Sequence, residues 1–261
     1  MRFASLGSGS EGNGLLVETG GGPAGGRRCR VLVDCGFGLK EAERRLERLG
    51  CAPGELDGIL VTHEHGDHVG GVFRLARAHR IPVYLTYGTL RASPQASGCE
   101  DRVRVIDSHR PFELGGFRVE PFPVPHDARE PVQYVIDDGD ARLGVLTDIG
   151  HPTAYLSLAL SRLTALVLET NHDAGLLADS DYPVSLKRRI SGRYGHLENA
   201  DSARILAALD RSRLRRVVAA HLSRQNNRAD LARAALAPVM GWDVSEVLVA
   251  DQDDGLGWTA G

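Results

Sequence analysis

Hydrophobic and polar positions follow one another along the chain with two periods, and these periods predict a mixed α/β structure. Short apolar runs bounded by glycine, proline or aspartate predict strands. Apolar positions that recur every three or four residues predict amphipathic helices that cover a sheet. The expected strands are 2–6, 15–18, 30–36, 58–61, 81–85, 103–106, 111–114, 117–122, 132–136, 142–147, 165–169, 216–220 and 244–249, and the expected helices are 39–49, 72–79, 183–190, 199–209 and 228–239.

The order of these elements predicts a four-layer αββα sandwich, in which two mixed β-sheets are flanked by helices. The strands from 103 to 147 are short and separated by glycine turns, which predicts a meander. Segment 86–100 predicts a short helix or lid, and the glycine-rich segment 20–26 predicts a hairpin tip. A chain of 261 residues can bury one sizeable core, so we expect a single domain over residues 1–261.

Composition narrows the class of protein. The chain has neither a run of about eighteen apolar residues nor an amino end like a signal peptide, so we expect a soluble cytoplasmic protein without a membrane segment. The four cysteines, Cys29, Cys35, Cys51 and Cys99, form no C-x-x-C pair, which argues against a disulfide framework or a cysteine zinc site. The net charge of -3 argues against nucleic-acid binding through overall basicity, although a local positive field can coexist with it.

Arginine dominates the basic residues, because all but Lys40 and Lys187 of the 31 Lys and Arg residues are arginine. We interpret this first as codon bias and only second as phosphate recognition. Three basic clusters are of interest, at 27–30, 187–189 and 211–216. A solvated face is the default interpretation of each.

The greatest density of polar chemistry lies in segment 61–71, which reads VTHEHGDHVGG directly after an apolar run. His63 and His65 are two apart on extended chain and project the same way, so they can share one metal ion. Asp67 and His68 then turn toward a second position. Imidazole and carboxylate groups suit zinc, manganese or iron. The alternative, a polar surface loop with several histidines, is disfavoured because this spacing is far more specific than a lone histidine pair.

Further candidate ligands lie where later predicted strands end, at His126, Asp148 and His221. Each of them alone has a simpler interpretation as a satisfied core residue. Their repeated position at strand ends disfavours that interpretation. Asp34 also ends a predicted strand, and we expect it to support a metal ligand.

The motif H-x-H-x-D-H at 63–68 resembles the signature of the metallo-β-lactamase superfamily. The resemblance implies two divalent metal ions, zinc or manganese with iron as a further option. Two such cations lower the pKa of a bridging water and stabilise both the attacking and the leaving oxygen. The implied ligands are His63, His65 and His126 for one ion, Asp67, His68 and His221 for the other, and Asp148 as the bridge.

Glu169, which ends a strand, and His196, which precedes a helix, predict a general acid. A glutamate that holds an imidazole fixes its tautomer and raises its basicity, which suits a group that protonates a departing oxygen. The alternative for His196 is a helix-entry residue, with Glu198 and Asn199 as caps. The pair resembles that of the tRNA 3′-processing nucleases and the motifs of the β-CASP nucleases, which implies a phosphodiester substrate. The interval 149–220 leaves no room for a long β-CASP insertion.

Most of the chain resembles the YycJ/WalJ family of compact metallo-β-lactamase-fold proteins. The matching segments are SGSEGN at 8–13, HDA at 126–128, TDIG at 147–150, ETNHD at 169–173 and HLS at 221–223. This resemblance implies a DNA 5′-exonuclease, with DNA favoured over RNA. Glu198 departs from the family, where serine is expected, and an acid there would raise the pKa of His196 or repel phosphate. We also expect substrate contacts from His172, Asn226 and Asn13.

The expected function is therefore hydrolysis of a nucleic-acid phosphodiester by a hydroxide that bridges two metal ions. Asp67 would orient the water, and His196, held by Glu169, would protonate the leaving oxygen. Two alternatives stay open from the sequence: a small-molecule hydrolase that acts on a thioester, lactone or cyclic nucleotide, and a non-catalytic metal-binding regulator. The sequence predicts no oligomeric state.

Overall fold

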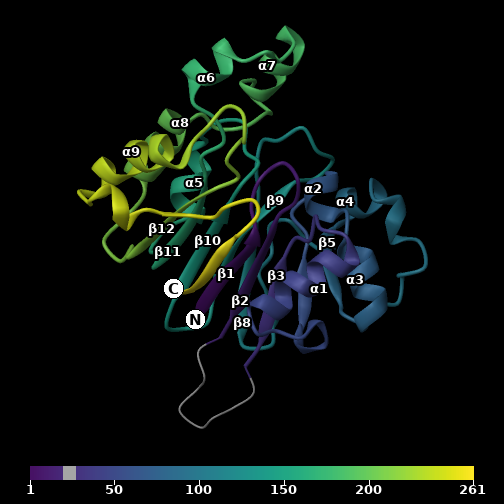
Figure 1. Ribbon diagram of the computed structural model, residues 1–261. Coiled ribbons are helices and arrows are strands. Elements are labelled where there is room, and N and C mark those ends of the chain that lie inside the picture. The colour runs from purple at the N-terminus through teal and green to yellow at the C-terminus, as the bar shows by residue number, and fades with distance from the viewer. Residues whose placement is uncertain (20–27) are drawn as a thin grey trace.

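Two β-sheets pack face to face in the computed structural model, which describes residues 1–19 and 28–261 (Figure 1). The expected hairpin tip at 20–26 lies outside the described residues. Sheet A has the spatial order β14 (Leu256–Ala260), β1 (Arg2–Gly7), β2 (Gly14–Glu18), β3 (Arg30–Val33), β4 (Gly58–Leu60), β5 (Val83–Thr86) and β6 (Val103–Ile106). Sheet B has the order β13 (Leu248–Val249), β12 (Arg216–Ala220), β11 (Ala165–Glu169), β10 (Arg142–Leu146), β9 (Val132–Asp137), β8 (Phe117–Pro123) and β7 (Phe112–Leu114).

Helices cover the outer face of each sheet, which confirms the expected αββα order (Figure 1). Beside sheet A lie α1 (Leu39–Arg48), α3 (Val72–His79) and α4 (Tyr87–Arg91), and beside sheet B lie α5 (Ala154–Ala159), α8 (Asn199–Ala208) and α9 (Ala229–Met240). The single turn α2 (Gly66–Val69) lies at one end of the sandwich, from which α6 (Ala174–Asp179) and α7 (Val184–Ile190) project. Short 3-10 turns are found at Pro53–Glu55, Pro94–Ala96 and Val244–Glu246. None of the helices in the described part of the chain has the length and apolarity needed to cross a bilayer.

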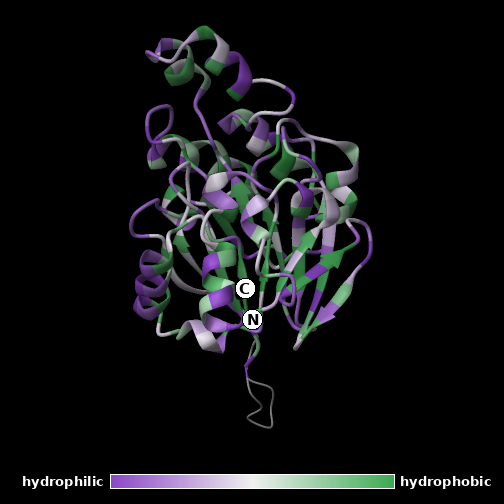
Figure 2. Ribbon diagram, turned by 90° about the vertical axis from the view of Figure 1, so that its right-hand side faces the viewer, coloured by the Kyte–Doolittle hydropathy of each residue, from purple (hydrophilic) through white to green (hydrophobic). Residues whose placement is uncertain are grey.

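The core consists of three apolar layers that hold the four structural layers together. Residues such as Phe117 and Tyr134 fill the space between the sheets. Leu46 and Phe73 pack α1 and α3 onto sheet A, and Leu206 is one of the residues that pack α8 onto sheet B. The strands are the most apolar part of the molecule and the outer helix faces the most polar (Figure 2). The strands are covered on both faces, which explains why their sequences are continuous apolar runs and do not alternate with polar residues.

Parallel strands in both sheets end at the same side of the sandwich. Strands β3 to β6 run parallel in sheet A, and β10 to β13 run parallel in sheet B. Ligands of open α/β sheets bind outside the carboxyl ends of such strands. The predicted metal ligands follow β4, β8, β10 and β12, so the topology places them at one edge.

Two sequence predictions about strands were wrong. The expected strand at 244–249 is a 3-10 turn followed by a two-residue strand, because Asp243 caps the turn by accepting a hydrogen bond from Ser245 N (2.9 Å). The expected meander from 103 is also divided, since β6 pairs in parallel with β5 in sheet A and only β7 to β10 form the meander in sheet B. The sequence interpretation missed β14, α5 and α6, which are short and lack a clear period.

Candidate active site

A buried aspartate from the neighbouring strand fixes the loop that follows β4. Asp34, just after β3, accepts hydrogen bonds from Thr62 N (2.8 Å) and Thr62 Oγ1 (2.7 Å). It also accepts one from His68 Nδ1 (2.8 Å), which turns Nε2 of that ring toward the other predicted ligands. Asp34 therefore contacts a predicted ligand, as expected from its position at a strand end. Oxygen partners of this kind fix the tautomer and orientation of metal-binding imidazoles.

Two glycines let the segments after β3 and β4 touch. A Cβ atom on Gly36 would lie 2.0 Å from the carbonyl oxygen of Asp67, and one on Gly71 would lie 1.8 Å from that of Phe37. Real Cβ atoms do not approach backbone this closely, so any other residue would push the loop out of position. The glycines thus belong to the geometry of the site.

Three residues at strand ends adopt left-handed backbone conformations. The φ angles are 61° for Asp34, 51° for Asp148 and 55° for His221. Such conformations cost about 1–3 kcal/mol for a residue other than glycine, although Asp and His tolerate them better than most. The hydrogen bond from His221 N to Ser8 Oγ (2.8 Å) helps to hold one of them. Backbone strain of this kind is concentrated at functional sites.

The structure brings all seven predicted metal ligands together. Potential ligand atoms lie within 4.8 Å of one another in four overlapping groups, one of which joins Asp148 and His221 to Glu169 and His196. Their imidazoles are further oriented by oxygen atoms, since His126 Nδ1 donates to Gly195 O (3.1 Å) and His221 Nδ1 to Glu169 Oε1 (3.3 Å). The other three groups are His63, His65 and His126; Asp67, His68 and His221; and His63, His68 and Asp148. The first two of these are the triads that the family resemblance implied, and metal binding itself stays a prediction.

Two buried polar atoms show that these residues suit metal ions. His63 Nε2 is buried and makes no hydrogen bond with any described residue, and the buried Asp148 Oδ2 has only His68 Nε2, itself a predicted ligand atom, beside it at 3.1 Å. Buried polar atoms usually have a partner, and a lone pair without one is the feature that a cation requires. Burial lowers the pKa of His63 well below its usual range, so its imidazole is in the neutral form that binds metal.

The other half of the site attracts positive charge. Burial lowers the pKa of His221, but the nearby carboxylates of Asp148, Asp67 and Glu169 outweigh that effect and raise it to about 10. His221 Nε2 lies 3.4 Å from Asp67 Oδ2, and His68 Nε2 lies 3.1 Å from Asp148 Oδ2. A cation between these groups is favoured electrostatically, because the carboxylates lie in a low-dielectric surrounding.

Glu169 and His196 meet, as their positions in the sequence predicted. His196 Nδ1 donates to Glu169 Oε1 (2.8 Å), and the second carboxylate oxygen accepts hydrogen bonds from Ile149 N (3.0 Å) and Leu197 N (3.3 Å). Burial lowers the pKa of His196, but Glu169 and then Asp148 outweigh it and raise the pKa above its usual value. The two carboxylates therefore favour the protonated form of the ring.

Glu198, the departure from the family pattern, points away from this pair. Its carboxylate lies 3.3 Å from the guanidinium of Arg204 on the exposed side of α8. The carboxylates that raise the pKa of His196 are Glu169 and Asp148. The expected influence of Glu198 on the pKa of His196 is therefore not found, because the Glu198 carboxylate pairs with Arg204.

The three residues that we expected to contact substrate are all buried. Asn13 is 7% exposed, and its Nδ2 lies 3.2 Å from Asp67 O and 3.1 Å from His68 Nε2. His172 is 2% exposed and Asn226 is fully buried. Asn13 thus holds two predicted metal ligands in place, and substrate contact by all three stays a prediction.

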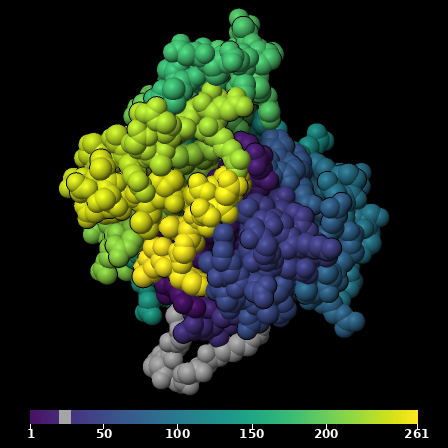
Figure 3. All heavy atoms as spheres, in the orientation of Figure 1, coloured from purple at the N-terminus to yellow at the C-terminus, as the bar shows by residue number. Residues whose placement is uncertain are grey.

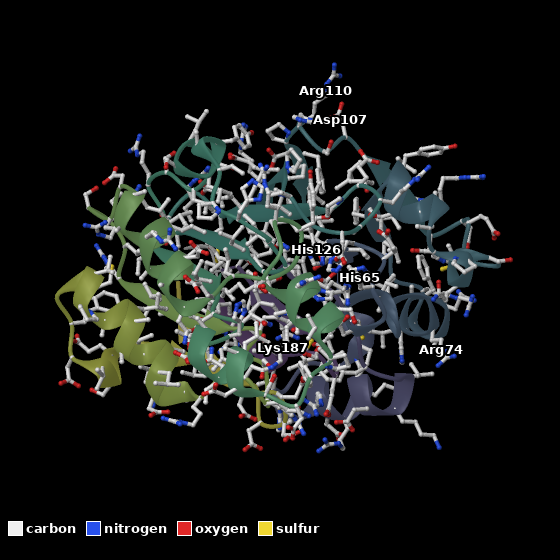
Figure 4. All side chains as sticks on the ribbon, turned by 90° about the horizontal axis from the view of Figure 1, so that it is seen from above. His65, Arg74, Asp107, Arg110, His126 and Lys187 are labelled. Atoms are coloured by element: carbon white, nitrogen blue, oxygen red, sulfur yellow. The ribbon has the colours of Figure 1, made fainter. Side chains whose placement is uncertain are left out.

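A cleft of about 370 Å³ opens onto the site. His65, Asp67, Asp148, His196 and His221 line it, and α7 closes one side with Arg189, which lies 2.7 Å from Asp127 Oδ2. His65 and His126 lie close together near the centre of the molecule when it is seen from above (Figure 4), with His126 Nε2 3.3 Å from His65 Nδ1. The sequence interpretation missed Arg189 and Asp127, although the basic cluster at 187–189 was the available signal.

Comparison of the sequence with known proteins identifies its family. Residues 29–222 match the family described as the Beta-lactamase superfamily domain. The chain is 33% identical to the exodeoxyribonuclease YycJ of Bacillus anthracis, over 97% of this chain and 96% of the relative. It is 30% identical to the exodeoxyribonuclease WalJ of Streptococcus pneumoniae, over 90% of this chain and 87% of the relative.

The fold has solved counterparts as well. The metallo-β-lactamase-fold protein YhfI from Bacillus subtilis superposes with a TM-score of 0.74 at 17% identity, over 99% of both chains. At that identity the likeness establishes the fold alone, and the sequence relatives establish the family. The chain therefore belongs to the beta-lactamase superfamily, a superfamily of hydrolytic enzymes, and within it to the family of the YycJ and WalJ proteins.

Proposed function

We propose that this protein is a nuclease that hydrolyses phosphodiester bonds of DNA as a 5′-exonuclease. The relatives named exodeoxyribonucleases support DNA as the substrate. Degradation from the 5′ end is inferred from the family resemblance of the sequence. The observation that carries the proposal is the hydrogen bond between His196 and the fully buried Glu169, because an alkoxide leaving group needs a proton. A proton donor of this kind suits a phosphodiester better than a thioester.

The metal centre would consist of two divalent ions, zinc or manganese with iron as an option. His63, His65 and His126 would hold one ion, Asp67, His68 and His221 the other, and Asp148 would contact both. The ions would supply an activated water and neutralise charge on the phosphate. This assignment is supported by the unpartnered lone pair on His63 Nε2 and by the buried carboxylate of Asp148.

The protein's own side chains would divide the remaining work. Asp67 lies at the start of α2 and lines the cleft, where its carboxylate would orient the attacking water. His196, 18% exposed at the side chain, would donate its proton to the departing oxygen. Glu169 would hold the ring in the protonated form before transfer and stabilise its orientation afterward.

A substrate panel tests the proposal. Protein loaded with zinc or manganese is given DNA labelled at its 5′ or 3′ end, RNA of the same sequence, bis-p-nitrophenyl phosphate and a thioester. We expect turnover of DNA with early release of the 5′ label and slower turnover of RNA. Preferred turnover of the thioester would show a small-molecule hydrolase instead, and full metal content without turnover of any substrate would show a non-catalytic binding protein.

A further inference from the structure

Helix α7 and its flanks stand apart from the rest of the fold. None of the seven residues of α7 is buried, and Figure 3 shows this region projecting from the end of the molecule above the site. The segment 182–194 contains no acidic residue, although the chain as a whole has a net charge of -3. A tyrosine lies at each end of it, Tyr182 in the cleft and Tyr194 with 60% exposure. Its four cations are Lys187, Arg188, Arg189 and Arg193.

The projecting segment is nevertheless attached firmly beside the predicted metal ligands. Asp127, next to His126, pairs with Arg189 and donates its backbone N–H to Tyr194 O (3.0 Å). A Cβ atom on Gly150, two residues after Asp148, would lie 2.2 Å from the carbonyl oxygen of Arg193. The position of the segment is thus set by Asp127 and Gly150, which follow the predicted ligands His126 and Asp148.

Two of its cations are available to a ligand. Lys187 Nζ donates to Ala178 O (2.6 Å), and Arg189 pairs with Asp127 (2.7 Å). Arg188 and Arg193 are exposed, and no acidic side chain of the described residues lies within 4.0 Å of either guanidinium. These two arginines therefore present unneutralised positive charge on the segment that lines the cleft through Tyr182, Leu186 and Arg189.

The other two basic clusters do not have this position. Arg28 and Arg30 pair with the buried carboxylate of Glu18 (2.9 Å and 2.6 Å). The cluster at 211–216 precedes β12, whose five residues place it about 16 Å from the site end of that strand. Among the three clusters that the sequence singled out, the one on α7 lies beside the candidate active site.

We propose that the segment 182–194 holds a single-stranded end of the nucleic acid, with Arg188 and Arg193 on its phosphates and Tyr194 stacked on a base. The inference rests on the proposed nuclease function and specifies the form of its substrate. A cleft of about 370 Å³ has the size of a site for a small molecule, which suits one nucleotide of a single strand. Stacking on an exposed tyrosine also requires an unpaired base.

Binding measurements test this surface apart from turnover. Metal-loaded protein is titrated into a fluorescent single-stranded phosphorothioate oligonucleotide, which resists hydrolysis, and into a blunt duplex of the same sequence. We expect Arg188→Ala/Arg193→Ala to weaken single-strand binding and to reduce the slope of log affinity against log salt by about 1 to 2. Tyr194→Ala should weaken it about tenfold, and Tyr194→Phe should restore it, since a phenyl ring also stacks.

A matched control separates this surface from overall charge. Arg74→Ala/Arg213→Ala removes the same charge at exposed positions elsewhere, and Arg74 lies at the outer edge of the molecule in Figure 4. Its affinity should stay near that of the unsubstituted protein. Equal losses of single-strand affinity in both double variants would overturn the inference, as would tighter binding of the blunt duplex than of the single strand.

The same protein preparations distinguish the failure of the inference from the failure of the proposed function. If the unsubstituted protein hydrolyses neither DNA nor bis-p-nitrophenyl phosphate, the nuclease proposal fails whatever the binding result. If it hydrolyses both, and the Arg188/Arg193 variant binds single strands normally, only the role of segment 182–194 is refuted.

Discussion

His196→Ala should slow the hydrolysis of DNA far more than the hydrolysis of an activated diester. The imidazole lies 2.8 Å from Glu169 Oε1 and 3.6 Å from Asp148 Oδ1, and these carboxylates keep it protonated. A positioned general acid contributes about 10²–10⁴-fold to rate, which is about 3–5 kcal/mol of activation free energy. We expect the loss for DNA to fall in this range.

The leaving group decides how much of this contribution is lost. The 3′ oxygen of a nucleotide leaves as an alkoxide and needs the proton of His196, whereas p-nitrophenolate delocalises its charge and leaves without one. Hydrolysis of bis-p-nitrophenyl phosphate by His196→Ala should therefore fall by less than about tenfold. The ratio of the two values of kcat/KM is the measured quantity.

Two controls make the comparison decisive. Metal content is determined for each preparation, because His196 lies beside predicted ligands. His109→Ala removes an imidazole whose side chain is 67% exposed and remote from the cleft residues, and it should leave both activities unchanged. If His196→Ala lowers both activities equally at full metal content, His196 acts by positioning and the general-acid role is refuted.

Three further predictions concern pH, stability and metal. Glu169→Gln should move the basic limb of the pH profile of kcat/KM to lower pH, because a general acid works below its pKa and Glu169 raises that of His196; an unmoved limb would contradict this. Tyr134→Phe should lower the free energy of unfolding in urea by about 1–3 kcal/mol, since the buried hydroxyl donates to Val61 O (2.7 Å). The same change at Tyr87, which is 61% exposed, should cost little. Chelation should lower Tm, with recovery on adding zinc or manganese; an unaltered Tm after proven metal loss would argue against ligands buried around an ion.

Residues at strand ends were the predictable part of the site. His126, Asp148 and His221 each follow an apolar run directly, and parallel strands bring such positions to one edge whatever the details of packing. The pairing of Glu169 with His196 followed in the same way, from a strand end and a helix start. Local sequence contains this information because the end of each apolar run marks where the strand stops.

Contacts made by loops were not predictable in this way. Arg189 reaches Asp127 across 62 positions of sequence through a segment without periodic apolar residues. The direction of the Glu198 side chain depends on the backbone between His196 and α8. Its nearness to His196 in sequence suggested an effect on that residue, whereas its carboxylate pairs with Arg204. Asn13 was expected at the cleft and is buried against Asp67, because the turn before β2 folds inward.

The strained strand ends are best understood together with the unpartnered atoms. Left-handed backbone at Asp34, Asp148 and His221 costs about 3–9 kcal/mol in all, at about 1–3 kcal/mol for each residue. That sum is comparable with the net stability of an ordinary domain, about 5–15 kcal/mol. The same site also buries His63 Nε2 without a hydrogen bond from any described residue, and it buries Asp148 Oδ2 with only the predicted ligand His68 beside it. Neither feature stabilises the chain by itself, whereas a bound cation would satisfy both atoms, so the site is built for a ligand at the expense of the stability of the protein alone.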